Sequence, residues 1–257
     1  MEDKFQKLVK FNKTMGFFHL IQAVLMLVLA TTVIQKIAEF QPMVTQLYLA
    51  FNFDTQSLES ASRELFSLPF GIFVSMFLFI SAGAHFYIVS NKEKYIDGLK
   101  NGINKYRWYE YALSSSIMIV LIATLFGVYD IATLLLIFVV NASMNIFGLV
   151  MEQVNMNKKK VDWEPFIWGT ITGIAPWVVI LTYMFGTGNF DMVPWFVWAI
   201  VGTYFVAFNT FPINMILQYK KVGKWKDYLY GERVYIILSL VAKSVLAWLV
   251  LFGAMQP

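Results

Sequence analysis

The stretch Val234-Tyr-Ile-Ile-Leu-Ser-Leu-Val-Ala-Lys-Ser-Val-Leu-Ala-Trp248 carries one charge, that of Lys243, within an otherwise uncharged and mostly apolar run. A run of this kind is typical of a helix that crosses a membrane. Lys243 comes ten residues after Arg233, which corresponds to a depth of about 15 Å at 1.5 Å per residue. A lysine at the centre of a span costs about 2.5–3.5 kcal/mol even on a lenient scale. This side chain therefore needs a partner or a function.

The composition of the whole chain also indicates a membrane protein. Of its 257 residues, 58% are hydrophobic and 14% are charged, whereas an ordinary soluble domain has about 25% charged residues. The absence of cysteine excludes disulfides and thiolate metal sites. The sequence predicts an all-α bundle of seven transmembrane helices that forms a single domain over residues 1–257. The predicted spans are Met15–Ile34, Leu68–Ser90, Arg107–Val128, Ile131–Met151, Pro165–Phe185, Val193–Gln218 and Val234–Phe252.

Two connections between the predicted spans have distinctive lengths. Only the turn-like Gly127–Asp130 separates the third span from the fourth, which predicts a tight helical hairpin. The one long connection is Gln35–Ser67, where polar and apolar residues alternate through Leu47–Phe53. Because alternation is the pattern of a half-buried strand, we expect this loop to be partly folded, as a short hairpin.

Basic residues are concentrated on one side of the predicted bundle. The N-terminal segment and every second connection hold 17 of the 20 lysines and arginines, whereas the opposite side holds only Lys36 and Arg63. The positive-inside rule therefore predicts a multi-pass protein of the cell membrane, with a cytoplasmic N-terminus, an extracellular C-terminus and an extracellular long loop. Lysines that flank the lipid also account for the pI of about 9.0. We expect membrane lipid around the protein, and no nucleic-acid partner.

The buried position of Lys243 has three interpretations: a snorkelling side chain, a structural ion pair, or a desolvated amine suited to Schiff-base chemistry. Its expected partner is Glu110, the one acid that falls neither in a loop nor at a segment end. If the third helix begins near Asn101, Glu110 lies two or three turns inside it. Ser239 precedes Lys243 by one turn, so its hydroxyl could bridge the nitrogen and the carboxylate. A protonated Schiff base in a low dielectric needs such an anion.

A ligand pocket is expected beside this pair, toward the middle of the membrane. Tyr111, Ser115 and Met118 recur at the spacing of one helical face, and the sixth and seventh spans offer Phe208 and Trp248. Methionine and aromatic stripes are more often plain packing, so none of these residues identifies a pocket alone. An amide within an apolar span usually bonds across helices or to a ligand, and Asn141 in the fourth span is such a residue.

The two histidines, His19 and His85, lie near the cytoplasmic ends of the first and second predicted spans. One interpretation is that both are satisfied by hydrogen bonds between helices. The alternative is a polar cytoplasmic cavity that accepts a proton. No carboxylate lies near either histidine in the sequence, so we expect no metal site.

Several stretches resemble those of the heliorhodopsins, and the resemblance extends over nearly the whole chain. They are Arg107-Trp-Tyr-Glu-Tyr-Ala-Leu-Ser-Ser-Ser116, Asn141-Ala-Ser-Met144, Gly231-Glu-Arg233 and Ser239-Leu-Val-Ala-Lys-Ser244. The resemblance implies all-trans retinal bound to Lys243 as a protonated Schiff base, with Glu110 as counterion and Ser239 beside it. It further implies an inverted topology, a homodimer and a folded first extracellular loop. It also implies pocket roles for Tyr111, Ser115, Met118, Asn141, Met144, Phe208 and Trp248.

The chain departs from the ion-pumping microbial rhodopsins at two positions. Those pumps have an aspartate four residues before the lysine, where this chain has Ser239; proton pumps have a carboxylic donor at the position of Leu121. We therefore expect a slow-cycling sensory photoreceptor that signals through its cytoplasmic face to an unidentified protein, without net pumping and without enzymatic activity. The alternatives are a light-gated or light-driven ion (proton) transporter, and a retinal-free membrane enzyme or transporter that uses Lys243 covalently.

Overall fold

The computed structural model describes residues 2–186, 188 and 193–253, and it contains seven helices that are long and apolar enough to cross a membrane. This confirms the predicted seven-helix architecture. The first span continues from α1 into a short π-helical segment, η1. The spans are α1 (Glu2–Val28) with η1 (Leu29–Val33), α3 (Phe70–Ser90), α5 (Lys105–Leu125), α6 (Ile131–Asn155), α7 (Glu164–Met184), α8 (Trp195–Tyr219) and α9 (Tyr228–Gly253).

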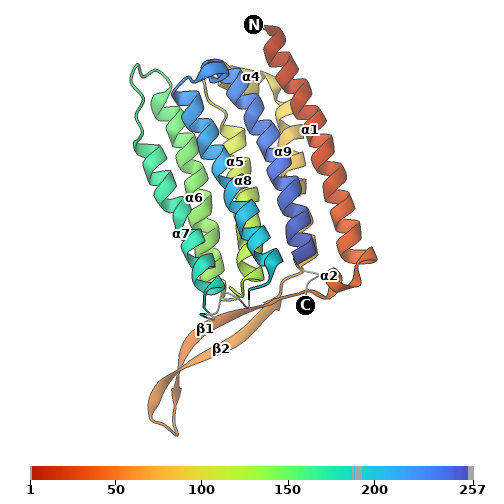
Figure 1. The fold of residues 1–257 in the computed structure, drawn as a ribbon, viewed down its shortest axis with the longest axis vertical. Coiled ribbons are helices and arrows are strands. Elements are labelled where there is room, and N and C mark those ends of the chain that lie inside the picture. Colours follow the sequence, from red (N-terminus) through yellow and green to blue (C-terminus); the bar gives the residue numbers. More distant parts are fainter. Residues whose placement is uncertain (1, 187, 189–192, 254–257) are drawn as a thin grey trace.

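Shorter elements lie at the two ends of the bundle (Figure 1). We call the end that carries the N-terminus and α4 (Lys92–Lys100) the N-terminal end. The 3-10 helix η3 (Gly223–Lys226) joins α8 to α9 there. The opposite end, here the hairpin end, carries α2 (Gln35–Glu39) and a two-stranded antiparallel sheet that projects from the bundle.

The first span begins earlier than predicted, at Glu2 instead of Met15. The charged N-terminal segment forms a helix because its apolar residues share one face. Phe5, Leu8 and Val9 are buried in one cluster with Tyr95 and other residues of α4. Because this face has a partner, the lysines of the same segment can remain exposed on the other side of the helix.

The third span begins later than expected, at Lys105 instead of near Asn101. Gly102 has a φ of +72°, which ends α4 in a turn that glycine adopts without strain. Asn104 then caps α5, because its side chain accepts a hydrogen bond from the backbone N–H of Arg107. Glu110 consequently lies in the second turn of α5, less deep along the helix than predicted.

The long connection is folded as a β-hairpin, with longer strands than the short hairpin that we expected. β1 (Met43–Asn52) pairs with β2 (Ser57–Ser67), from Met43 opposite Ser67 to Asn52 opposite Ser57. The bundle holds the base of this hairpin through the loop between α5 and α6. The backbone N–H of Thr45 donates to the carbonyl of Tyr129 over 2.9 Å, and that of Leu47 donates to Asp130 Oδ1 over 3.2 Å.

Asp130 therefore joins two elements, because its other oxygen caps α6 by accepting from the backbone N–H of Thr133 over 2.9 Å. Asp130→Ala should lower the free energy of unfolding by about 0.5–2 kcal/mol, the usual value of a lost N-cap. It should also speed amide exchange at Leu47. Thermal unfolding and hydrogen exchange in detergent measure both effects. Asp54→Ala, in the exposed turn of the hairpin, is the control; equal losses in the two variants would contradict this role.

The stabilisation by Asp130 should depend on pH in a defined direction. Burial raises the pKa of this carboxyl. Hydrogen bonds from the backbone N–H groups of Thr133 and Leu47 lower the pKa, and together the hydrogen bonds outweigh burial, so the pKa lies below its usual value. A depressed pKa contributes stability above the unfolded-state pKa, and this contribution is lost as the pH falls through the folded-state pKa. The difference in the free energy of unfolding between wild type and Asp130→Ala should thus be largest at neutral pH and become smaller in acid.

Candidate functional site

Lys243 of α9 and Glu110 of α5 form an ion pair in the interior of the bundle. Both residues are buried, at 3% and 9% exposure. Ser81 of α3 completes the group: Lys243 Nζ donates to Ser81 Oγ over 2.6 Å, and Ser81 Oγ donates to Glu110 Oε1 over 2.6 Å. The side chain of Tyr111 lies beside the ammonium, whose nitrogen is 5.2 Å from the ring centroid. The structure thus brings together the lysine and the acid that the sequence singled out.

The hydroxyl that bridges the pair is that of Ser81, and not that of Ser239 as predicted. Ser239 is buried on the same helix as Lys243 but donates to neither partner; it lines a small cavity that Glu110 also lines. No sequence pattern indicates a role for Ser81, because a serine in a span can always donate to its own helix, and this one also contacts the carbonyl of Phe77. Only the crossing of α3 with α5 and α9 shows its role.

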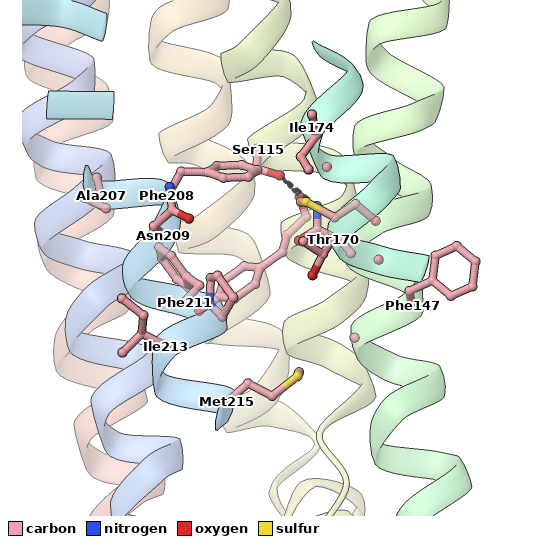
Figure 2. A pocket seen from close by; sticks show the side chains of 18 of the residues that line it. Ser115, Phe147, Thr170, Ile174, Ala207, Phe208, Asn209, Phe211, Ile213 and Met215 are labelled. Carbon is pink, nitrogen blue, oxygen red and sulfur yellow. Dashed lines mark hydrogen bonds between the residues drawn. The ribbon is translucent and has the colours of Figure 1, made fainter. Parts of the chain in front are cut away.

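A larger cavity of about 430 Å³ lies on the other side of Lys243, between α5, α6, α7, α8 and α9 (Figure 2). In Figure 2, Phe208 and Phe211 of α8 lie across from Ser115 of α5 and Thr170 of α7. Six residues of the predicted site line this cavity: Lys243, Tyr111, Ser115, Met118, Met144 and Phe208.

Two of the predicted pocket residues, Asn141 and Trp248, do not line this cavity. Asn141 lies behind Ser115, which does line the cavity. Its Nδ2 donates to the hydroxyls of Ser115 and Ser116 over 2.9 Å each and so joins α6 to α5. Trp248 packs against Phe252, with ring centroids 5.7 Å apart. It follows Lys243 by five residues, about 140° around the helix, so it cannot share the face of the lysine.

Sequence reasoning missed the aromatic and glycine residues that shape the cavity. Trp177, Tyr204 and Phe211 form much of its wall. Gly169 and Gly173 of α7 let α6 approach closely, because a Cβ at position 173 would stand 2.6 Å from the sulfur of Met144. This spacing of small residues, four apart in an apolar span, is a known signal of close helix packing and could have identified the contact.

The cavity suits an elongated apolar molecule bound at its polar end to Lys243. Its volume is within the usual range of ligand pockets, about 300–1,000 Å³, and most of its lining side chains are aliphatic or aromatic. It reaches the lipid-facing surface between α7 and α8, where the exposed side chains of Ile174, Phe205 and Ile213 line it. A retinal polyene fits these properties, and Lys243 is the amine to which it would attach.

The two histidines lie together, with ring centroids 5.4 Å apart in a stacked arrangement. His85 Nδ1 is hydrogen-bonded to Asn12 Oδ1 over 2.8 Å, whereas both ring nitrogens of His19 are buried without a partner in the structure. The interpretation that both are satisfied between helices is therefore wrong for His19. Within the part of the chain that the structure describes, no three histidine or acidic side chains are grouped as a metal site would require.

A second buried charge cluster lies at the N-terminal end and was not predicted. Arg107 pairs with both Glu152 and Glu232, and all three side chains are at most 5% exposed. Each of these residues is at the edge of an apolar run: Arg107 begins the predicted third span, and Glu152 and Glu232 fall in predicted connections. They are buried because α6 and α9 extend beyond those runs, to Asn155 and from Tyr228.

Comparison with known proteins assigns the family. A family model described as heliorhodopsin matches residues 8–255 of the chain. Among curated proteins, none matches the chain. The match extends over nearly all of a seven-helix chain in which a buried lysine borders an apolar cavity. The chain therefore belongs to the heliorhodopsin family and is a retinal-binding rhodopsin, a multi-pass membrane protein.

Proposed function

We propose that this protein is a slow-cycling sensory photoreceptor in which all-trans retinal forms a protonated Schiff base with Lys243, and that it moves no net ion and has no enzymatic activity. The observation that carries the proposal is the buried pair of Lys243 and Glu110 at the wall of an apolar cavity. When bound, retinal supplies the absorption of visible light and the isomerisation that follows.

The residues around Lys243 are suited to hold a proton at its nitrogen. Glu110 provides the negative charge that favours the protonated form in a low dielectric, and Ser81 fixes the carboxylate by donating to Oε1. On the other side, Met118, Trp177 and Phe208 line the cavity and give it an apolar wall that disfavours water. The polar end of the site therefore lies at the lysine, and the apolar end lies between the helices.

The hairpin half of the bundle supports the absence of pumping. Within the described residues, no buried acid, histidine, lysine or arginine lies between Lys243 and the hairpin end. Buried polar side chains there, such as Ser75 and Thr124, donate to carbonyls of their own helices. Because proton movement needs a chain of titratable groups or water, an apolar half is a barrier to the transporter alternative.

We propose that the light signal is passed to a partner protein at the N-terminal end. We assign this end to the cytoplasm because it carries the basic connections. This places the hairpin outside the cell, with the protein in the cell membrane. The exposed Leu47, Leu49 and Phe53 of the hairpin region support a homodimer, and the exposed lysines at the other end suit an as yet unidentified cytoplasmic protein.

The covalent attachment can be tested by colour. Purified protein supplied with all-trans retinal should absorb visible light, and Lys243→Ala should be colourless because the amine is lost. Hydroxylamine should bleach the wild type. Lys100→Ala, an exposed lysine of α4, is the control and should keep the full colour. A colourless wild type would favour the retinal-free enzyme or transporter.

The counterion can be tested by its charge and by its neighbours. Glu110→Gln should shift the visible band to the red and leave more protein in the near-ultraviolet form at neutral pH, because the anion is removed. Ser81→Ala should shift the band more than Ser239→Ala, since Ser81 alone contacts both partners. Absorption spectra over a range of pH measure this. An unchanged spectrum in Glu110→Gln would show that another group is the counterion.

The absence of pumping can be tested by electrophysiology. In a voltage-clamped cell that expresses the coloured protein, illumination should give a photocurrent near zero at every holding potential. The apolar hairpin half is the physical reason. A known light-driven proton pump expressed in the same cells is the positive control. A sustained current in one direction would overturn the sensory proposal in favour of the transporter.

A further inference from the structure

The buried charges of the described residues do not balance. Two cations, Lys243 and Arg107, face three carboxylates, those of Glu110, Glu152 and Glu232. The pair of Lys243 and Glu110 is neutral, so the surplus negative charge belongs to the cluster around Arg107. An unpaired charge in a low dielectric is costly, and a carboxylate can relieve this cost by binding a proton.

The two carboxylates of this cluster differ in how completely their oxygens are used. Glu152 accepts four hydrogen bonds: from Arg107, from Trp108 Nε1 over 2.8 Å, from the backbone N–H of Asn104 over 2.9 Å and from Tyr228 OH over 3.3 Å. A carboxylate has about four lone-pair sites. The four lone-pair sites of the ionised Glu152 carboxylate therefore all have a donor.

Glu232 accepts only three hydrogen bonds, from Arg107, from Asn104 Nδ2 over 2.6 Å and from Tyr95 OH over 3.3 Å. One lone-pair site of Oε2 remains without a donor. The other groups near Glu232 do not supply a further cation. The charged and titratable side chains around this cluster are Tyr95 of α4, Arg107 of α5, Glu152 of α6, and Tyr228 and Tyr235 of α9. His85 of α3 and Tyr106, Glu110 and Tyr111 of α5 line the adjacent cavity together with Glu232.

A small cavity connects this carboxylate with the lysine pair. It has a volume of about 30 Å³, and Glu110, Ser81 and Ser239 line it together with Glu232, Asn104 and Arg107. A space of this size holds one or two water molecules, and its polar lining offers the partners that such water needs. Glu152 does not line it. Of the two cluster carboxylates, only Glu232 therefore faces Glu110.

We propose that Glu232 is the group that receives and holds the proton released from the Lys243 nitrogen after light absorption. This inference rests on the proposed function. The N–H bond at Lys243 breaks with its electron pair left on nitrogen, the proton passes by way of Glu110 and cavity water, and an O–H bond forms on Glu232. Glu110 then carries the surplus charge, which Ser81 and cavity water stabilise. No other reactant is consumed.

The alternative acceptors are less suitable for holding the proton. On Glu110 the proton would remain in contact with the nitrogen and would return to it. On His19 or His85 it would create a buried cation at a desolvated ring. On Glu232 it removes the surplus negative charge of a cluster in which two carboxylates share one cation, Arg107. Protonation also weakens the buried contacts to Arg107 and Tyr95, which tie α9 to α5 and α4 near the N-terminal end.

Light-minus-dark infrared spectroscopy tests this assignment. Wild-type protein with ¹³C-labelled glutamate should gain a band of a protonated carboxylic acid that shifts with the label. Glu232→Gln should lose this band, and the blue-shifted, deprotonated state should accumulate several-fold less. Glu232→Asp should keep a band at a shifted frequency, which a merely structural role would not produce. A band that persists unchanged in Glu232→Gln, or no carboxylic band in the coloured wild type, would overturn the proposal.

A second readout needs neither light nor retinal. In the retinal-free protein, Glu232→Gln should unfold at the same temperature as wild type or higher, because the surplus charge is removed. Glu152→Gln, the matched control in the same cluster, should lower the melting temperature by several degrees, because it breaks the saturated partner of Arg107. Equal losses in both variants would show that Glu232 is a structural ion. If the wild type forms no pigment, the proposed function fails; a pigment without these effects refutes only the role of Glu232.

Discussion

The ammonium of Lys243 cannot remain in an apolar interior without a nearby anion, and this electrostatic constraint determines which helices meet at the centre of the bundle. Glu110 brings α5 to α9, and Ser81 brings α3 to both by bonding the nitrogen and the carboxylate together. Removing one partner would leave a buried charge unpaired, which costs more than the pair itself contributes. The larger cavity then lies on the side of Lys243 away from Glu110 and Ser81, where most of the lining side chains are aliphatic or aromatic.

The bundle is consequently divided into two unlike halves. Toward the N-terminal end, buried polar groups follow one another from Glu110 through the small cavity to Arg107 and its two carboxylates. Toward the hairpin end, the core is formed by aliphatic and aromatic side chains. Polar groups that can respond to a change of charge at Lys243 therefore lie only toward the N-terminal end, among the described residues. This asymmetry links the location of the charges to a response at the N-terminal end, and it argues against a continuous path through the protein.

What could be predicted from the sequence depended on how much a residue differs from its neighbours. Lys243 and Glu110 were identifiable because each is a charge within an apolar segment. Glu152 and Glu232 were missed because they stand at the ends of apolar runs, where the polar connections begin and burial leaves no local signal. Ser81 was missed because its role depends on a contact between residues 162 positions apart. The seven spans follow from hydropathy alone, whereas the start of α1 depends on its packing against α4.

The two charge clusters share the same pair of parallel helices, and this arrangement couples them mechanically. α5 carries Arg107 and Glu110 only three residues apart, whereas α9 carries Glu232 and Lys243 eleven residues apart, a separation of about 16 Å on nearly the same face. Side chains of a helix lean toward its N-terminus, so Lys243 extends toward the level of Glu110. Arg107 extends likewise toward the N-terminal end, where Glu232 lies. A shift of α9 along α5 that loosens one pair must therefore strain the other.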